Sequence, residues 1–76
     1  LNFADDLVIS TKIRGKLLLN SELPYINYTV ETVNSIVYVI GIAESEDERL
    51  SVIDLCKEVY GVVDVIDYIE ITTENY

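Results

Sequence analysis

Apolar positions in the first quarter of the chain recur with the spacing of a helix. Ile9, Ile13 and Leu17 stand four apart, so they form one stripe along a helix face. Two aspartates open this segment and suit the positive N-terminal end of a helix. The pattern therefore predicts a helix over residues 5–19. Because glycine weakens a helix interior, we expect a close packing contact at Gly15.

Apolar and polar positions then change to the two-residue period of strands. Residues 26–33 alternate and are rich in β-branched side chains, and residues 36–43 are apolar throughout. Between them, Asn34 and Ser35 fit a two-residue turn that makes the two runs a hairpin. Serine is a poorer second residue than glycine for a type I′ turn.

The expected hairpin register assigns each strand residue to a sheet face. It places Tyr28 opposite Gly41, and we interpret this pair as packing, with the ring lying over the bare glycine. One face holds Ile26, Tyr28, Val30, Val37, Val39, Gly41 and Ala43, and the other holds Thr29, Glu31, Val33, Ile36, Tyr38, Ile40 and Ile42.

A run of acids follows the second strand and marks the start of a second helix. Ser45 and Glu48 have the spacing of a capping box, and three acids occupy the first turn. The helix is predicted to continue to about Tyr60, with Gly61 as its left-handed C′ residue. Residues 62–71 read as the last strand. The apolar face of this helix holds Val52, Cys56 and Val59, flanked by Leu55.

The order helix, strand, strand, helix, strand predicts a single small α+β domain. A strand–helix–strand unit crosses over and leaves its strands parallel, so residues 36–43 become the central strand and are apolar on both faces. We expect a three-stranded mixed sheet with both helices packed on one face. The domain is predicted to span residues 5–72. Residues 1–4 and 73–76 are interpreted as the flexible ends of a fragment excised from a longer chain, because the sequence begins at Leu1 and contains no methionine.

Charge limits the classes of partner. Fourteen acids against five bases give a net charge of −9, which repels phosphate backbones and excludes nucleic acid as the expected partner. Anionic membrane would be repelled too, except at a local basic patch. Lys12 and Lys16, four apart on the first helix, form the only such patch. They are the candidate phospholipid contact, although a plain solvated face is the simpler interpretation.

Catalytic chemistry is poorly represented. The chain has no histidine, which is the usual general base and the commonest zinc ligand. Its single cysteine, Cys56, falls on the packed helix face and is interpreted as a core residue rather than a nucleophile. The acids around residues 44–48 lack the ligand spacing of a calcium loop and are interpreted as a solvated helix start. We therefore expect no enzyme activity, no cofactor and no metal site.

The pattern resembles the BON domain, a small module of bacterial envelope and stress proteins. The segment "NSIVYVIG" is similar to the family's "NG-V-V-x-L-x-G", with serine where glycine is usual. Further matches lie in the two helices and the last strand, at Asp6, Ile9, Ile13, Leu17, Glu48, Arg49, Gly61, Val62 and Val65, with Cys56 where alanine is usual. The resemblance implies a non-enzymatic binding module associated with phospholipid or envelope surfaces, located in the envelope or periplasm. A few cytoplasmic relatives bind a monovalent cation, so a cation-sensing domain is the alternative.

Two helices can cover only one face of a three-stranded sheet. The glycine-containing face permits close helix approach and is the face expected to be covered. The apolar residues of the open face are then Ile36, Tyr38, Ile40 and Ile42, beside Ile66 and Tyr68 of the last strand. A contiguous apolar patch, unlike isolated apolar residues, indicates a docking surface. We expect another copy of the domain or a neighbouring domain to cover it.

Overall fold

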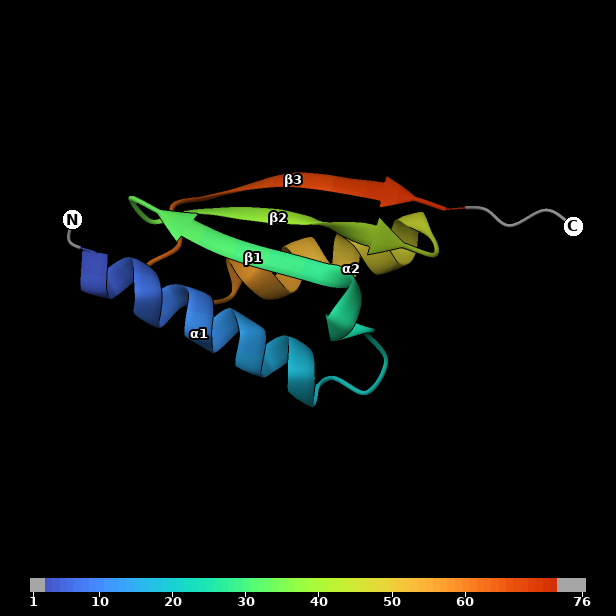
Figure 1. Cartoon of the computed structure of the whole chain (residues 1–76), viewed down its shortest axis with the longest axis horizontal. Coiled ribbons are helices and arrows are strands. Elements are labelled where there is room, and N and C mark those ends of the chain that lie inside the picture. The colour runs from blue at the N-terminus through green and yellow to red at the C-terminus, as the bar shows by residue number, and fades with distance from the viewer. Residues whose placement is uncertain (1–2, 73–76) are drawn as a thin grey trace, which may run out of the picture.

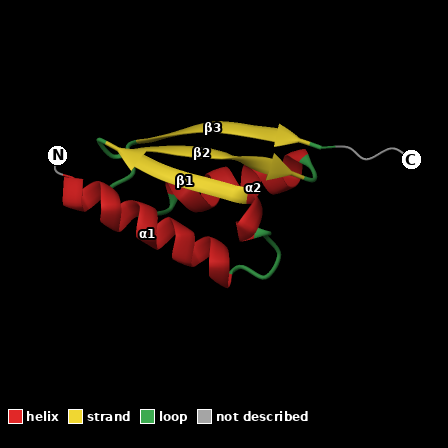
Figure 2. Cartoon of the chain, viewed as in Figure 1, coloured by secondary structure: helices red, strands yellow, loops and turns green. Residues whose placement is uncertain are grey.

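The computed structural model describes residues 3–72 and contains two helices, a short 3₁₀ turn and three strands (Figures 1 and 2). The order of elements confirms the predicted α+β class. They are α1 (Phe3–Leu19), η1 (Tyr25–Asn27), β1 (Tyr28–Val33), β2 (Ile36–Ala43), α2 (Glu46–Lys57) and β3 (Asp64–Ile71). Of the ends predicted to be flexible, residues 3 and 4 belong to α1, while residues 1–2 and 73–76 lie outside the described residues.

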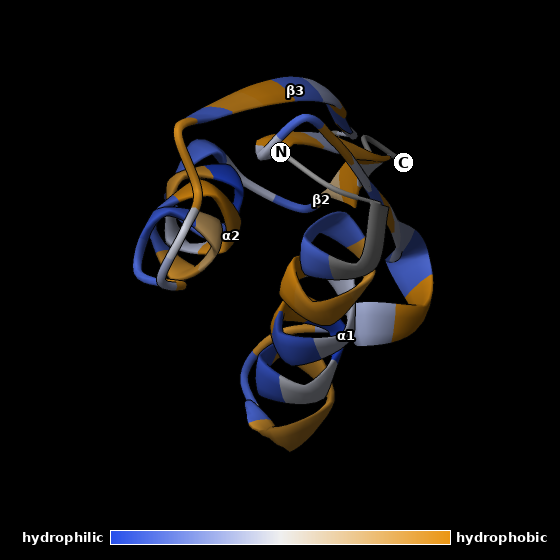
Figure 3. Cartoon of the chain, turned by 90° about the vertical axis from the view of Figure 1, so that its left-hand side faces the viewer, coloured by the Kyte–Doolittle hydropathy of each residue, from blue (hydrophilic) through white to orange (hydrophobic). Residues whose placement is uncertain are grey.

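The sheet has the order β1-β2-β3, with β2 antiparallel to β1 and parallel to β3. Both helices lie on one side of it, α1 beneath β1 and α2 beneath the other two strands (Figures 1 and 3). The predicted hairpin register is confirmed, including Tyr28 opposite Gly41. β2 is the middle strand, and the helices explain its apolar character on the face that they cover, whereas its other face is open.

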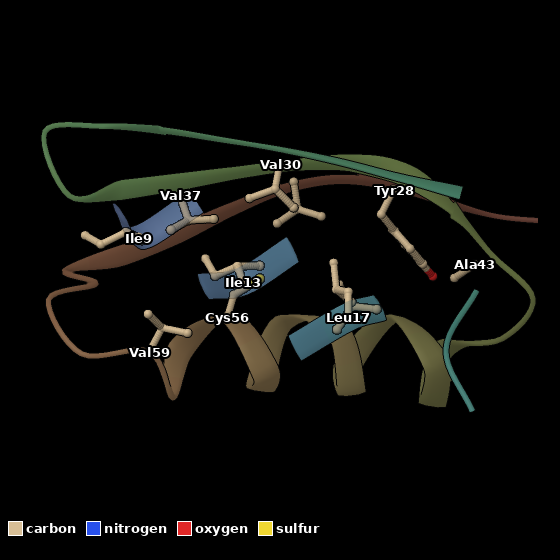
Figure 4. Close-up of a cluster of buried hydrophobic side chains, with 11 residues drawn as sticks. Ile9, Ile13, Leu17, Tyr28, Val30, Val37, Ala43, Cys56 and Val59 are labelled. Atoms are coloured by element: carbon tan, nitrogen blue, oxygen red, sulfur yellow. The ribbon is translucent and has the colours of Figure 1, made fainter. Parts of the chain in front are cut away.

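The hydrophobic core lies between the helices and the lower face of the sheet (Figure 4). Both helices and both hairpin strands contribute to it. Five residues predicted to share this core are fully buried: Ile13, Val37, Val39, Val52 and Cys56. The ring of Tyr28 occupies the place of a side chain at Gly41. A β-carbon there would collide with the Asn27 carbonyl oxygen and come within 2.5 Å of Cδ1 of that ring.

The second helix begins with the expected cap, but it is shorter than predicted, and Gly61, although left-handed, is not its C′ residue because the C-cap is Glu58. Ser45 Oγ accepts a hydrogen bond from the Glu48 amide at 3.1 Å, and Gly61 has a φ of +96°. The helix ends at Lys57 rather than near Tyr60, and the following turns delay β3 until residue 64. These turns are fixed by backbone hydrogen bonds, since the Val63 amide donates to the Ser35 carbonyl at 2.9 Å.

Two further local predictions were wrong. Ile26 lies in η1 with its side chain 81% exposed, because Pro24 precedes a 3₁₀ turn that delays β1 until Tyr28. Gly15 makes no close packing contact, since no heavy atom lies within 4 Å of the position that its β-carbon would occupy. Glycine at this position is therefore not required by packing within the domain.

The hairpin turn is held by the first helix. Asn34 and Ser35 have φ values of 52° and 65°, the left-handed conformation of a type I′ turn. The carboxylate of Asp6, in the first turns of α1, accepts hydrogen bonds from both backbone amides at 2.8 Å. Asp6 is only 8% exposed. Asp6, which the sequence places at the positive N-terminal end of α1, thus also joins that helix to the hairpin.

Candidate docking surface

The open face of the sheet lies opposite both helices and carries the predicted apolar residues. In the β2–β3 register, Tyr38 pairs with Ile66 and Ile40 pairs with Tyr68, so their side chains are immediate neighbours. The structure therefore brings together all members of the predicted patch. We call this set the open-face patch: Ile36, Tyr38, Ile40, Ile42, Ile66 and Tyr68.

Exposure within the open-face patch increases away from the hairpin turn. Ile40, Ile42 and Tyr68 expose 52%, 49% and 63% of their surface, whereas the other three members are half-buried by their neighbours. The strands that carry the patch are shown with their hydropathy in Figure 3, where β3 has both apolar and polar stretches. A rigid sheet that presents adjacent isoleucines and tyrosines is suited to an apolar contact in which the tyrosine hydroxyls keep polar partners.

Acids surround the open-face patch on the same side of the sheet. Glu31 lies opposite Tyr38, Asp64 opposite Ile36, and Glu70 opposite Ile42. All three acids are exposed. A partner that buries the apolar centre therefore meets a negatively charged rim, which favours lysine or arginine at the edge of the partner's surface.

The two lysines of the predicted lipid contact are exposed on α1, and each lines a surface hollow together with an acid. Lys12 borders a hollow that also includes Asp5, and Lys16 borders another that includes Glu58. These carboxylates offset the attraction of the lysines for an anionic headgroup. In the described part of the chain, no helix is long and apolar enough to cross a bilayer.

Among the described residues, no group of side chains is assembled for catalysis or for metal binding. Burial raises the pKa of the Cys56 thiol to about 11, so the nucleophilic thiolate is disfavoured at neutral pH. Residues 3–72 contain no cluster of three or more histidine, cysteine or acidic side chains placed to hold a metal ion.

Motif residues at the start of α2 have structural contacts. The Tyr28 hydroxyl donates a hydrogen bond to the carboxylate of Glu48, and burial together with this carboxylate raises the pKa of the tyrosine. Arg49 binds the carboxylate of Asp67 through two nitrogens, at 3.0 and 3.3 Å, and also pairs with Glu46 at 2.8 Å. These contacts attach α2 to β1 and β3, so they explain the motif without a ligand.

Sequence reasoning missed a groove beside the edge strand β1. It has a volume of about 450 Å3 and lies between the C-terminal half of α1, η1 and the first half of β1. Its walls include Leu18, Tyr25 and Ile26, which are 58%, 49% and 81% exposed. The available signal was that Leu18 falls outside the buried stripe of α1, yet no sequence pattern places it near Ile26.

The described residues form a small α+β domain whose sheet has one face covered by helices and one open face. The BON domain profile matches residues 5–73, so the chain belongs to the BON domain family. This family is known as non-catalytic. The chain is also 38% identical over 68 residues to an "Uncharacterized protein in gshII 5'region" of Anaplasma centrale. The match covers 90% of this chain but only 45% of that relative.

Proposed function

We propose that this BON domain is a non-catalytic interaction module that docks to another protein surface through its open-face patch. The observation that carries the proposal is the contiguity of six apolar side chains on two paired strands. Burying such an exposed apolar surface against a partner stabilises the complex by roughly 25 cal/mol for each Å2 of apolar area removed from water.

The acidic rim narrows the class of partner. A second copy would bring its own acids towards Glu31, Asp64 and Glu70, and like charges across an interface are unfavourable. A neighbouring domain or separate protein with a basic rim fits better. Because the curated relative is longer than the matched region, the remainder of the full-length gene product is the first partner to test.

The test compares the accessibility of the patch in the isolated domain and in the full-length gene product. In Tyr68→Cys, the new thiol should react rapidly with a maleimide in the isolated domain and slowly in the full-length protein. The matched control is Ser51→Cys on the exposed side of α2, which should react equally in both. Native Cys56 is buried and serves as the unreactive internal reference.

A second variant confirms that protection comes from docking. Adding Tyr38→Glu with Ile40→Lys to Tyr68→Cys should restore rapid labelling in the full-length protein while leaving the far-UV spectrum unchanged. Equal labelling of Tyr68→Cys in the two contexts, together with a monomeric isolated domain that captures no partner, would refute the proposal.

A further inference from the structure

A second surface, separate from the open-face patch, is formed by the groove beside β1. Both buried Leu17 and Gly15 of α1 line it, and no heavy atom lies within 4 Å of the position that a β-carbon at Gly15 would occupy. Exposed apolar side chains line it from α1 and from η1. The full lining is Arg14, Gly15, Leu17, Leu18, Tyr25, Ile26, Tyr28, Thr29 and Val30.

The groove runs along the free edge of the sheet. No strand of the described chain pairs with β1 on the side away from β2. The two-residue turn makes Val33 and Ile36 a hydrogen-bonded pair, and such pairs alternate along an antiparallel ladder. The backbone groups of Tyr28 and Val30 consequently face outward, towards the groove side.

Of these four outward-facing backbone groups, two already have hydrogen-bond partners. The Tyr28 amide donates to the Tyr25 carbonyl, and the Val30 carbonyl accepts from the guanidinium of Arg14. The Tyr28 carbonyl and the Val30 amide remain directed at the edge. In a parallel ladder, one residue of an added strand donates to the first of these groups and accepts from the second.

We propose that β1 binds an extended segment of a partner polypeptide as an added parallel strand, with apolar side chains of that segment in the groove. The residue that bonds the β1 backbone points its side chain to the open face, as Thr29 does. Its two neighbours therefore point to the helix side, into the space between Leu18 and Ile26. Arg14, held at Val30 and paired with Glu31 at 3.2 Å, marks the end of the paired stretch.

Charge specifies the rest of the segment. The residues between the apolar side chains of the added strand point to the open face, where Glu31 of β1 is exposed, so lysine or arginine at these positions is attracted, whereas a second copy of this chain, which carries −9, is repelled. The expected occupant is therefore an extended cationic segment with alternating apolar side chains.

The probe is a fluorescein-labelled short peptide that alternates lysine with leucine, and the readout is fluorescence anisotropy with the isolated domain. Two control peptides have the same sequence except that one carries N-methyl groups along its backbone and the other has glutamate in place of lysine. Because only the parent peptide combines backbone donors with positive charge, both controls should bind at least about tenfold more weakly.

Adjacent leucines provide matched variants of the protein. Leu18 lines the groove and Leu19 does not, although both are exposed on α1. Leu18→Ser should weaken binding of the peptide by about tenfold, since an apolar contact is lost. Leu19→Ser should leave it unchanged, and neither variant alters the net charge. Amide NMR shifts on peptide addition should centre on Val30 rather than on the open face.

Several results would overturn the strand-addition proposal. They are equal binding of the N-methylated peptide, equal effects of the two serine variants, and shifts centred on Tyr38 and Tyr68. A groove that takes up an acyl ligand such as oleate but not the peptide would also overturn it. None of these results alters the maleimide test of the open-face patch, because that patch lies on different side chains.

Discussion

Asp6 provides the most direct test of how this fold is held together. Its carboxylate accepts two backbone hydrogen bonds at 2.8 Å, from Asn34 and Ser35, in a setting that is only 8% exposed. A hydrogen bond to a charged group contributes about 1.5–3 kcal/mol. Asp6→Ala removes both bonds and leaves the buried Ser35 amide and the part-buried Asn34 amide without their acceptor, so we expect a loss of about 3–5 kcal/mol.

This loss is large for a domain of 76 residues, whose whole stability is expected to be about 4–11 kcal/mol. Urea unfolding monitored by far-UV circular dichroism and tyrosine fluorescence will measure it. Asp47→Ala is the matched control, since this exposed acid lies in the first turn of α2 and has a comparable dipole effect of less than about 1 kcal/mol. If the two variants lose the same small amount, the hairpin does not depend on Asp6 and the reasoning fails.

Four further predictions concern local conformation, titration and lipid. In urea unfolding, Ser35→Gly should raise the free energy of unfolding by about 1 kcal/mol, because glycine adopts the observed left-handed φ without strain. A lower free energy of unfolding would show that the serine side chain is needed. Gly15→Ala should raise the melting temperature, with a gain of up to about 1 kcal/mol, since nothing obstructs the added methyl group. The pKa of Cys56 is raised to about 11 from about 9, so folding favours its neutral thiol. The stability that the thiol contributes below pH 9 is therefore lost as the pH rises through 11. The stability difference between the parent and Cys56→Ala should narrow by about 2 kcal/mol over that range. Sedimentation with anionic vesicles should show weak, salt-sensitive binding that changing Lys12 and Lys16 to glutamate reduces, and unchanged partitioning would exclude these lysines.

The fold of this domain leaves the open-face patch and the β1 edge as two separate surfaces of the sheet. The helices cover one face, so the opposite face and the outer edges of β1 and β3 are left without a paired element in the described chain, and the groove lies beside the β1 edge. Each surface offers a different kind of contact, side chains in the first case and backbone groups in the second. The two sets of variants above therefore separate their roles.

Local pattern was sufficient for most of the architecture. The four-residue spacing of Ile9, Ile13 and Leu17 predicted a helix whose stripe is buried, and the Asn34-Ser35 turn predicted the register of the hairpin. Once that register was known, the period of two assigned every strand side chain to a face. The open-face patch could thus be predicted because it depends on register and chain order alone.

Tertiary structure was required wherever residues distant in sequence meet through side-chain geometry. The bonds from Asp6 to the hairpin span 28 and 29 positions, and neither residue type nor spacing indicates them. The same applies to Arg49 at Asp67, and to Glu58, which lines the same surface hollow as Lys16. The groove depends on the angle at which α1 leaves β1 and on the 3₁₀ turn that carries Ile26. Periodicity determines which side of an element is buried, whereas the packing angle between two elements determines which exposed groups come to face one another.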